Sequence, residues 1–241
     1  MPAEISIASG AGRSRIVMMR RHGGPEVLEI EQQDVALPQP GYVRMRVRAI
    51  GLNRSDVNVR VGTFALRPLP CSLGFEAAGL IDALGDDVTG LAVGDRVAVI
   101  PLAKAGFTTY GEHILVPASL VAKIPPPLDF AEAAALWASA LTAYGPLVGH
   151  GVIEPGDHVV VTAASSSVGT AALQILRRLD AVPIAVTRDA TKAAALRYLD
   201  EGEAAAIAAV EDVKGAVFNS KDFHEGIMSF IERRDANFQG E

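Results

Sequence analysis

Apolar and polar positions between residues 157 and 186 follow the order strand, turn, helix, strand. Residues 159–161 form a short β-branched run, typical of a strand buried on both faces. Small residues from Ala163 to Ser167 then allow a sharp turn. Apolar residues recur at helical spacing after the turn, at Val168, Ala171, Ala172, Ile175, Leu176 and Leu179. Residues 182–186 form a second apolar run, so the pattern predicts a β-α-β unit.

The first hundred residues alternate in the manner of strands. Apolar residues from Val43 to Ala49 alternate with Arg44, Arg46 and Arg48, which predicts a half-buried strand whose arginines form a solvated face or, alternatively, an anion site. The same reading gives four further short strands and one polar turn or short helix. The strands are expected at residues 16–18, 27–30, 75–84 and 94–99, and the turn or helix at residues 53–60. The pattern indicates a compact β lobe.

Helical patterns connect this lobe to the β-α-β unit. Three prolines, residues 125–127, mark a break. Asp129 is expected to cap a helix over residues 130–137, with Glu132 completing a capping box. Ser139 is expected to cap a second helix over residues 140–148.

The turn of the β-α-β unit is a candidate phosphate site. Ala164, Ser166 and Gly169 stand where the dinucleotide fingerprint G-x-G-x-x-G has its glycines. The amides at the start of the following helix would bind a pyrophosphate. A plain β-α-β turn without a ligand is the alternative that this degenerate fingerprint leaves open.

Composition narrows the class of protein. The chain has 241 residues, a net charge of −6 and one cysteine, Cys71. Mild acidity without a Lys/Arg-rich run argues against nucleic acid as a partner. A single cysteine excludes an internal disulfide framework and a multi-cysteine zinc site. No apolar run reaches the roughly 18 residues of a membrane span, and no signal-peptide pattern opens the chain. We therefore expect a cytoplasmic protein with no membrane partner.

Several motifs occur in one order along residues 14–198. They are Gly24-Pro-Glu-Val-Leu28, Gly51-Leu-Asn-Arg-Ser-Asp56, Gly74-Phe-Glu-Ala-Ala-Gly79, Gly94-Asp-Arg-Val97, Tyr110-Gly-Glu112, Ala133-Ala-Ala-Leu136, Leu141-Thr-Ala-Tyr144 and Ala163-Ala-Ser-Ser-Ser-Val-Gly169. With these motifs the chain resembles the medium-chain dehydrogenase/reductase superfamily, and most closely its zinc-less, quinone-oxidoreductase-like branch. The resemblance implies an α/β fold, with a GroES-like β lobe packed on a Rossmann domain and nicotinamide in the cleft between them.

The resemblance also divides the chain. It predicts a disordered N-terminus over residues 1–13, a GroES-like domain over 14–138, and a partial Rossmann domain over 139–200. This unit is a truncated, doubly wound parallel sheet, because the family pattern stops near Tyr198. Residues 201–241 are expected to form a helical tail. The stretch from about residue 203 resembles the C-terminal end of crotonase-fold enoyl-CoA hydratases, and it is either a docking helix for a partner or the scar of a gene fusion or reading error.

The metal ligands of zinc-containing relatives are absent. Zinc members of the superfamily have a cysteine where residues 53–55 stand, and Gly-His-Glu where this chain has Gly74, Phe75 and Glu76. Zinc prefers thiolate and imidazole ligands, so the resemblance implies a zinc-independent protein.

Three residues are candidates for the reaction. Asn53 and Asp56 match the Asn-x-x-Asp of the zinc-less branch, and Tyr110 is a third candidate. Asn53 and Asp56 are equally residues that cap helices, and a buried tyrosine often only donates a hydrogen bond. Mitochondrial-type enoyl reductases have a proton-donating tyrosine near the position of Phe64. Because Phe64 has no hydroxyl, the sequence favours quinone or alkenal chemistry over enoyl-thioester reduction.

Cofactor choice is expected to depend on the end of the second strand. NADP binding favours cationic and hydroxyl groups there, and this chain offers Thr187, Arg188 and Lys192. Asp189 argues against NADP, and simple surface exposure of these charges is the alternative. The resemblance adds a further set of residues expected to bind NADP(H), namely Thr142, Ala164, Ser165, Ser166, Ser167, Val168 and Gly169.

Two functions follow from the sequence. One is hydride transfer from NADPH to a quinone, alkenal or related small carbonyl compound, in a chain that is a homodimer by family analogy. The other is a non-catalytic relative that serves as an interaction module or a remnant. Residues 199–241 distinguish them, since half a parallel sheet leaves an edge and an apolar face exposed unless something covers them.

Overall fold

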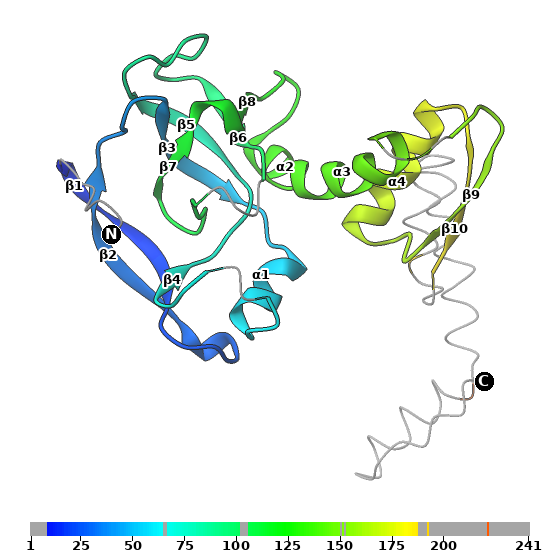
Figure 1. Ribbon diagram of the computed structural model, residues 1–241, viewed down its shortest axis with the longest axis horizontal. Helices are drawn as coiled ribbons and strands as arrows, with labels where there is room; N and C mark the ends of the chain where they lie inside the picture. The colour runs from blue at the N-terminus through cyan, green and yellow to red at the C-terminus, as the bar shows by residue number, and fades with distance from the viewer. Residues whose placement is uncertain are drawn as a thin grey trace. The chain divides into compact units, whose positions relative to one another are not determined.

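The computed structural model describes residues 9–64, 67–101, 106–149, 151, 153–187, 192 and 221. The chain divides into two compact units, Met1–Leu141 and Thr142–Glu241 (Figure 1). The division falls within a helix, three residues beyond the domain boundary predicted after residue 138. The architecture is α/β, as predicted, with a β lobe in the first unit and a β-α-β element in the second.

The β lobe contains a five-stranded antiparallel sheet. Its strands, in spatial order, are β7 (His113–Pro117), β3 (Tyr42–Ile50), β5 (Ala77–Leu84), β6 (Arg96–Val99) and β8 (Val121–Lys123). Fully buried side chains from β3 and β5 form its centre, including Val43, Met45 and Ile81. The alternation read from the sequence therefore places the apolar face of β3 correctly.

The arginines of β3 do not share one environment. Arg46 and Arg48 are exposed, in agreement with the expected solvated face. Arg44 is different, because its side chain is only 15% exposed and its Nε donates to Asp82 at 2.8 Å. The ion pair to β5 removes Arg44 from the solvated face.

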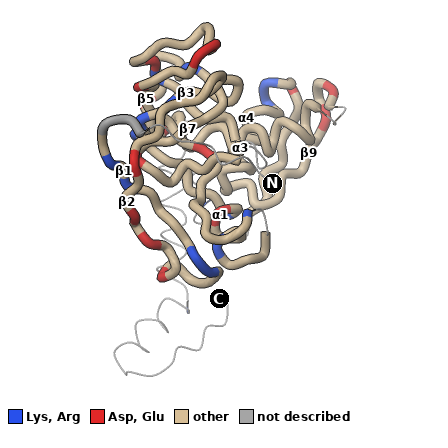
Figure 2. Tube along the Cα trace, turned by 60° about the vertical axis from the view of Figure 1, so that its left-hand side comes forward, with Lys and Arg blue, Asp and Glu red and all other residues tan. Residues whose placement is uncertain are grey.

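A second, three-stranded antiparallel sheet orders β2 (Leu28–Ala36), β1 (Ser9–Met19) and β4 (Cys71–Ser72). β1 begins at Ser9, which pairs with Ala36, and it therefore starts within the segment 1–13 for which the sequence predicts disorder. Figure 2 shows acidic and basic residues interspersed along this hairpin, where Arg20 pairs with Glu31 at 2.8 Å.

Four α-helices lie among the described residues. They are α1 (Arg54–Arg60), α2 (Phe130–Ala134), α3 (Trp137–Tyr144) and α4 (Ser167–Arg178), and a π-helical stretch, Gly145–Gly149, follows α3. The predicted capping box of α2 is present, because Glu132 N donates to Asp129 Oδ1 and Asp129 N to Glu132 Oε2, both at 2.8 Å. The helix ends at Ala134, earlier than predicted.

The expected cap of the next helix is wrong. α3 begins at Trp137, so Ser139 lies inside it and its hydroxyl donates back to the Leu136 carbonyl at 3.1 Å. The Ala138 amide instead donates to the carboxylate of Glu76 at 2.8 Å. A residue 62 positions away in the sequence therefore supplies the cap.

The second unit contains the predicted β-α-β element. β9 (His158–Thr162) and β10 (Val182–Val186) are parallel, with Val182 opposite His158, and α4 connects them. Ala172, Leu173 and Leu176 form the buried face of α4.

The prediction that β9 is buried on both faces is wrong. Val160 is 59% exposed, and Ile184 on β10 is also exposed. Within the described residues β9 pairs only with β10, and α4 is the one α-helix of the second unit with a substantial interface to either strand. The apolar run of β9 predicts burial on both faces, but the described residues leave Val160 exposed.

Several predictions lie outside the described residues. They concern Arg188, Asp189 and the crotonase-like tail. Beyond Thr187, only Lys192 and Lys221 are described. In the part of the chain that is described, no helix is both long enough and apolar enough to cross a membrane.

The burial of β5 gives a test of the lobe's core. Ile81→Ala should lower the free energy of unfolding by about 2–5 kcal/mol, because Ile81 is 1% exposed and its removal leaves a cavity. Ile30→Ala is the matched control, since Ile30 is 70% exposed and should change stability by no more than about 0.5 kcal/mol. Urea denaturation followed by circular dichroism measures both. Equal losses would contradict this placement of the core.

Candidate functional site

The first candidate site lies at the start of α1, in the β lobe. Asn53 is the N-cap residue, in an extended conformation with φ −120° and ψ 150°. Its backbone N–H donates to Asp56 Oδ2 at 3.1 Å, and the Asp56 N–H donates to the Asn53 carbonyl at 3.1 Å. Both residues thus take part in capping α1, which was one of the two roles that the sequence left open.

Asp56 is a buried carboxyl group with several hydrogen-bond donors. Besides the Asn53 amide, Gly74 N donates to Oδ1 at 3.0 Å, and the Tyr110 side chain lies near the carboxyl group. Burial raises the pKa of Asp56, these hydrogen bonds partly offset the rise, and the nearby Glu76 adds to it. The structure therefore brings all three predicted residues, Asn53, Asp56 and Tyr110, into one cluster.

Tyr110 enters this cluster from the segment before β7. Its backbone is fixed on both sides, because Tyr110 N donates to the Leu73 carbonyl at 3.0 Å and the Val17 N–H donates to the Tyr110 carbonyl at 2.8 Å. Burial raises the pKa of the Tyr110 phenol, and the nearby Asp56 carboxylate raises it further. The Tyr110 hydroxyl therefore keeps its proton at neutral pH, beside the carboxyl group of Asp56.

Glu76 belongs to the same cluster and is the residue that sequence reasoning missed. It is 3% exposed, and its Oε1 accepts from Asn53 Nδ2 at 3.0 Å. The sequence motif Gly74-Phe75-Glu76 drew attention to Glu76 only as part of a missing zinc site. A glutamate immediately before the apolar run of residues 77–81 is a signal for a buried, hydrogen-bonded carboxylate.

The second candidate site is the turn between β9 and α4. Ala163 has a positive φ of 50°, and Ala164 is fully buried. Ser166 is the N-cap of α4 and accepts from Gly169 N at 3.0 Å. A Cβ on Gly169 would lie 2.5 Å from the Ala163 carbonyl oxygen, so only glycine lets the helix approach the turn this closely. This is the packing role of the third glycine in a dinucleotide fingerprint.

A cavity of about 570 Å³ opens beside this turn. Four of the predicted cofactor residues line it together, namely Ser165, Ser166, Thr187 and Lys192. Ala164, Ser167, Val168 and Gly169 form the turn and the first residues of α4. Thr142 lies on α3 and is not among the lining residues, and Arg188 lies outside the described residues.

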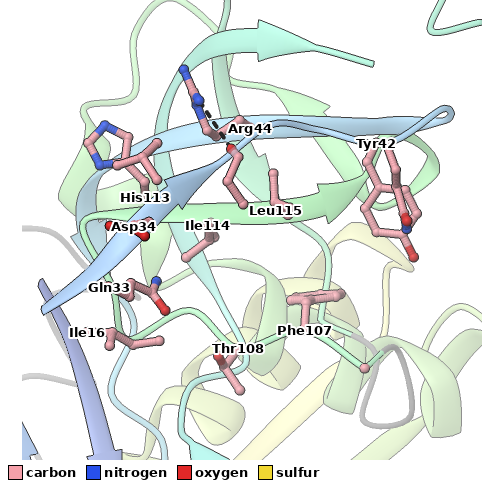
Figure 3. Close-up of a pocket in the computed structure, with 14 residues that line it drawn as sticks. Ile16, Gln33, Asp34, Tyr42, Arg44, Phe107, Thr108, His113, Ile114 and Leu115 are labelled. Atoms are coloured by element: carbon pink, nitrogen blue, oxygen red, sulfur yellow. Dashed lines mark hydrogen bonds between the residues drawn. The ribbon is translucent and has the colours of Figure 1, made fainter. Parts of the chain in front are cut away.

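Two further cavities lie in the β lobe. The larger, of about 610 Å³, has Ile16, Phe107 and Ile114 among its apolar lining, and Arg44 and His113 among its polar lining (Figure 3). It contains none of the predicted site residues. The smaller, of about 380 Å³, is bordered by Tyr110.

Across the described ranges, no group of three or more His, Cys, Asp or Glu side chains is placed to hold a metal ion. The two stretches that correspond to ligands in zinc members do converge, since Asn53 contacts Glu76, but they contribute an amide and a carboxylate that are bonded to each other.

Part of the chain matches a known domain family, and most of it matches known proteins. Residues 39–126 match the alcohol dehydrogenase GroES-like domain family. The chain is 38% identical to a quinone oxidoreductase of Lama guanicoe over 174 residues, which cover 71% of this chain and 52% of that protein. The chain therefore spans about half the length of this relative.

Solved structures show the same relationship. A quinone oxidoreductase of Escherichia coli complexed with NADPH matches with a TM-score of 0.68 and 30% identity, covering 81% of this chain and 56% of that one. A structure described as an NAD-dependent alcohol dehydrogenase matches with a TM-score of 0.73 and 36% identity, covering 78% of this chain and 62% of that one.

These similarities support the resemblance to the medium-chain dehydrogenase/reductase superfamily. They also confirm the predicted fold class, a GroES-like β lobe together with a Rossmann-type unit. The roles of the individual site residues remain predictions.

The close approach at Gly169 can be tested by adding one methyl group. Gly169→Ala should destabilise the second unit by about 1–3 kcal/mol, because the new Cβ meets the backbone of Ala163 and Ala164. Gly145→Ala is the control in the same unit, since a Cβ there meets no atom within 4 Å. Thermal unfolding of both variants is the measurement. A neutral Gly169→Ala would show that the turn is not packed as described.

Proposed function

We propose that the chain is a zinc-independent oxidoreductase that uses NADPH to reduce a quinone, alkenal or related carbonyl compound. The observation that carries this proposal is the cavity beside the β9–α4 turn, where Ser165, Ser166, Thr187 and Lys192 meet. Relatives named quinone oxidoreductase support the reaction class.

The residues around this cavity fit a dinucleotide. α4 has twelve residues, and the first amides of a helix have no partner within it, so those of Ser167 and Val168 can donate to a pyrophosphate. Small side chains at Ala163 and Ala164 keep the turn open for a close approach. A volume of about 570 Å³ lies within the range of small-molecule sites.

The choice of NADPH over NADH rests on Thr187 and Lys192. Both line the cavity at the carboxyl end of β10, where the family places the adenosine ribose. A hydroxyl and an ammonium group suit a 2′-phosphate, whereas NAD favours an acidic residue. The similar structures include two that are complexed with NADPH and one described as NAD-dependent, so we assign the choice of cofactor in this chain to Thr187 and Lys192.

The proposed role of Asn53 is to hold the substrate. NADPH, when bound, supplies the hydride. Asn53 is half-buried and carries a side-chain amide that can donate to a carbonyl oxygen as negative charge develops on it. Asp56 accepts from the backbone N–H of Asn53 at the start of α1, so it holds Asn53 in place.

Zinc independence is proposed on the chemistry of the donors. Asn53 and Glu76 occupy the stretches that hold ligands in zinc members, and their polar atoms are hydrogen-bonded to each other. An amide is a poor substitute for the thiolate that zinc prefers. Carbonyl polarisation would then come from hydrogen bonding.

A second function is favoured by one observation. Val160, Ile184 and Val186 are exposed on the β9–β10 pair. An uncovered apolar face of this kind is typical of a contact with another chain. The alternative is therefore a non-catalytic interaction module, and cofactor binding separates it from the enzyme.

NADPH binding is the first test. Isothermal calorimetry of the purified chain should give micromolar NADPH binding and much weaker NADH binding. Lys192→Ala should weaken NADPH binding by about 10-fold to 100-fold, the range for one charge-assisted hydrogen bond, and leave NADH binding unchanged. Lys123→Ala removes the same charge from β8 and serves as the control. A folded chain that binds neither cofactor would overturn the enzyme and favour the interaction module.

Activity tests the role of Asn53. Asn53→Ala should lower kcat/KM for NADPH oxidation with a naphthoquinone or an alkenal by about 10²-fold, as the loss of one oriented donor does. Asn58→Ala is a matched control, because Asn58 lies in the same helix and is also half-buried. Thermal melting of both variants separates loss of the cap from loss of activity. Equal effects of the two substitutions on activity would rule out a special role for Asn53.

A further inference from the structure

Glu76 joins two elements that are far apart in the sequence. Its Oε1 accepts from Asn53 Nδ2 at 3.0 Å, and its Oε2 accepts from the Ala138 N–H at 2.8 Å. Asn53 is the N-cap of α1, and Ala138 is in the first turn of α3. One buried carboxylate therefore serves the N-terminal ends of two helices.

A carboxylate only accepts hydrogen bonds, whereas a side-chain amide has a donating and an accepting end. Only the Nδ2 end of Asn53 can face Glu76 favourably. We infer that Glu76 is a positioning residue, which fixes the orientation of the Asn53 amide and so the order of donor and acceptor that Asn53 presents to a substrate. The kinetic consequence of this inference rests on the proposed function, but the orientation itself does not.

The position of Glu76 is itself fixed by its surroundings. Its backbone carbonyl accepts from Gly51 N at 3.1 Å and from Thr109 Oγ1 at 3.1 Å. A Cβ on Gly51 would collide with the Glu76 side chain, so the glycine makes room for the carboxylate. Both the main chain and the carboxylate of Glu76 are thus held, as a positioning role requires.

Substitution of Glu76 by glutamine should reverse which end of the Asn53 amide faces residue 76. In Glu76→Gln, Oε1 can still accept from Ala138 N, which leaves Nε2 facing Asn53. Two amide nitrogens cannot bond to each other, so Asn53 should turn its Oδ1 toward Gln and move its Nδ2 away. Glu29→Gln makes the same chemical change at an exposed position of β2 and should have no such effect.

Nuclear magnetic resonance of the full chain labelled with ¹⁵N-asparagine measures the orientation directly. The chain has four asparagines, at positions 53, 58, 219 and 237, so few side-chain amide signals are expected. Asn53→Ala identifies the signal of Asn53. That signal should shift and exchange its protons faster in Glu76→Gln, and it should be unchanged in Glu29→Gln. An unaltered Asn53 signal in a folded Glu76→Gln variant would overturn the inference.

A paired substitution tests the same contact if Glu76→Gln is destabilised. Asn53→Asp keeps a good N-cap but places two carboxylates together. The double variant Asn53→Asp, Glu76→Gln restores a complementary acceptor and donor. Each single variant should lower the thermal midpoint by about 3 °C or more, and the double variant should recover at least half of the summed loss. Additive losses would contradict a direct Asn53–Glu76 contact.

Kinetics then separate the inference from the proposed function. Glu76→Gln should lower kcat/KM by about 10-fold or more, and adding Glu76→Gln to Asn53→Ala should cost little further, because Glu76 acts only through the Asn53 amide. If the amide signal and the thermal cycle behave as expected and the wild-type chain reduces no quinone or alkenal, the proposed function fails and the positioning by Glu76 stands. If reduction is observed and the two substitutions act independently on it, Glu76 does not position Asn53.

Discussion

A buried carboxylate must find hydrogen-bond donors, and this requirement organises the β lobe around Glu76. The donors come from Asn53 at the start of α1 and from Ala138 at the start of α3. Helix N-termini are suited to this because their amides lack partners within the helix and favour negative charge. Asp56, in the first turn of α1, is likewise a buried carboxyl group, and it accepts from the amides of Asn53 and Gly74. The candidate site is thus the place where the buried carboxyl groups of Asp56 and Glu76 find their hydrogen-bond donors.

What could be predicted from the sequence depends on how local the cause is. The β-α-β element and the alternation of β3 follow from side-chain periodicity within a few residues, and both are confirmed. Local sequence rules predict Ser139 as the cap of α3 because they consider only neighbouring residues, whereas the actual acceptor is Glu76, 62 positions away from Ala138. Likewise, a run of valines in β9 indicates a tendency to be buried, but what covers Val160 depends on other parts of the fold.

The candidate site was predicted unevenly for the same reason. Motif resemblance singled out Asn53, Asp56 and Tyr110, and the fold brings them together. It did not reveal that Gly74 N donates to Asp56, nor that Asn53 donates to Glu76, because both contacts join segments that meet only after folding. The small residues of the β9–α4 turn have a local cause that the sequence shows. Gly169 is required because its Cα lies against the backbone of Ala163, only six residues earlier.

The β9–α4 turn and the end of β10 contribute to the cavity in different ways. The turn offers backbone amides and small side chains, while the end of β10 offers the particular groups of Thr187 and, further along the chain, Lys192. In the proposed site, the strength of phosphate binding and the discrimination between cofactors are therefore separable traits. Selection or protein engineering could exchange one nicotinamide cofactor for the other by changing only Thr187 and Lys192, without rebuilding the turn.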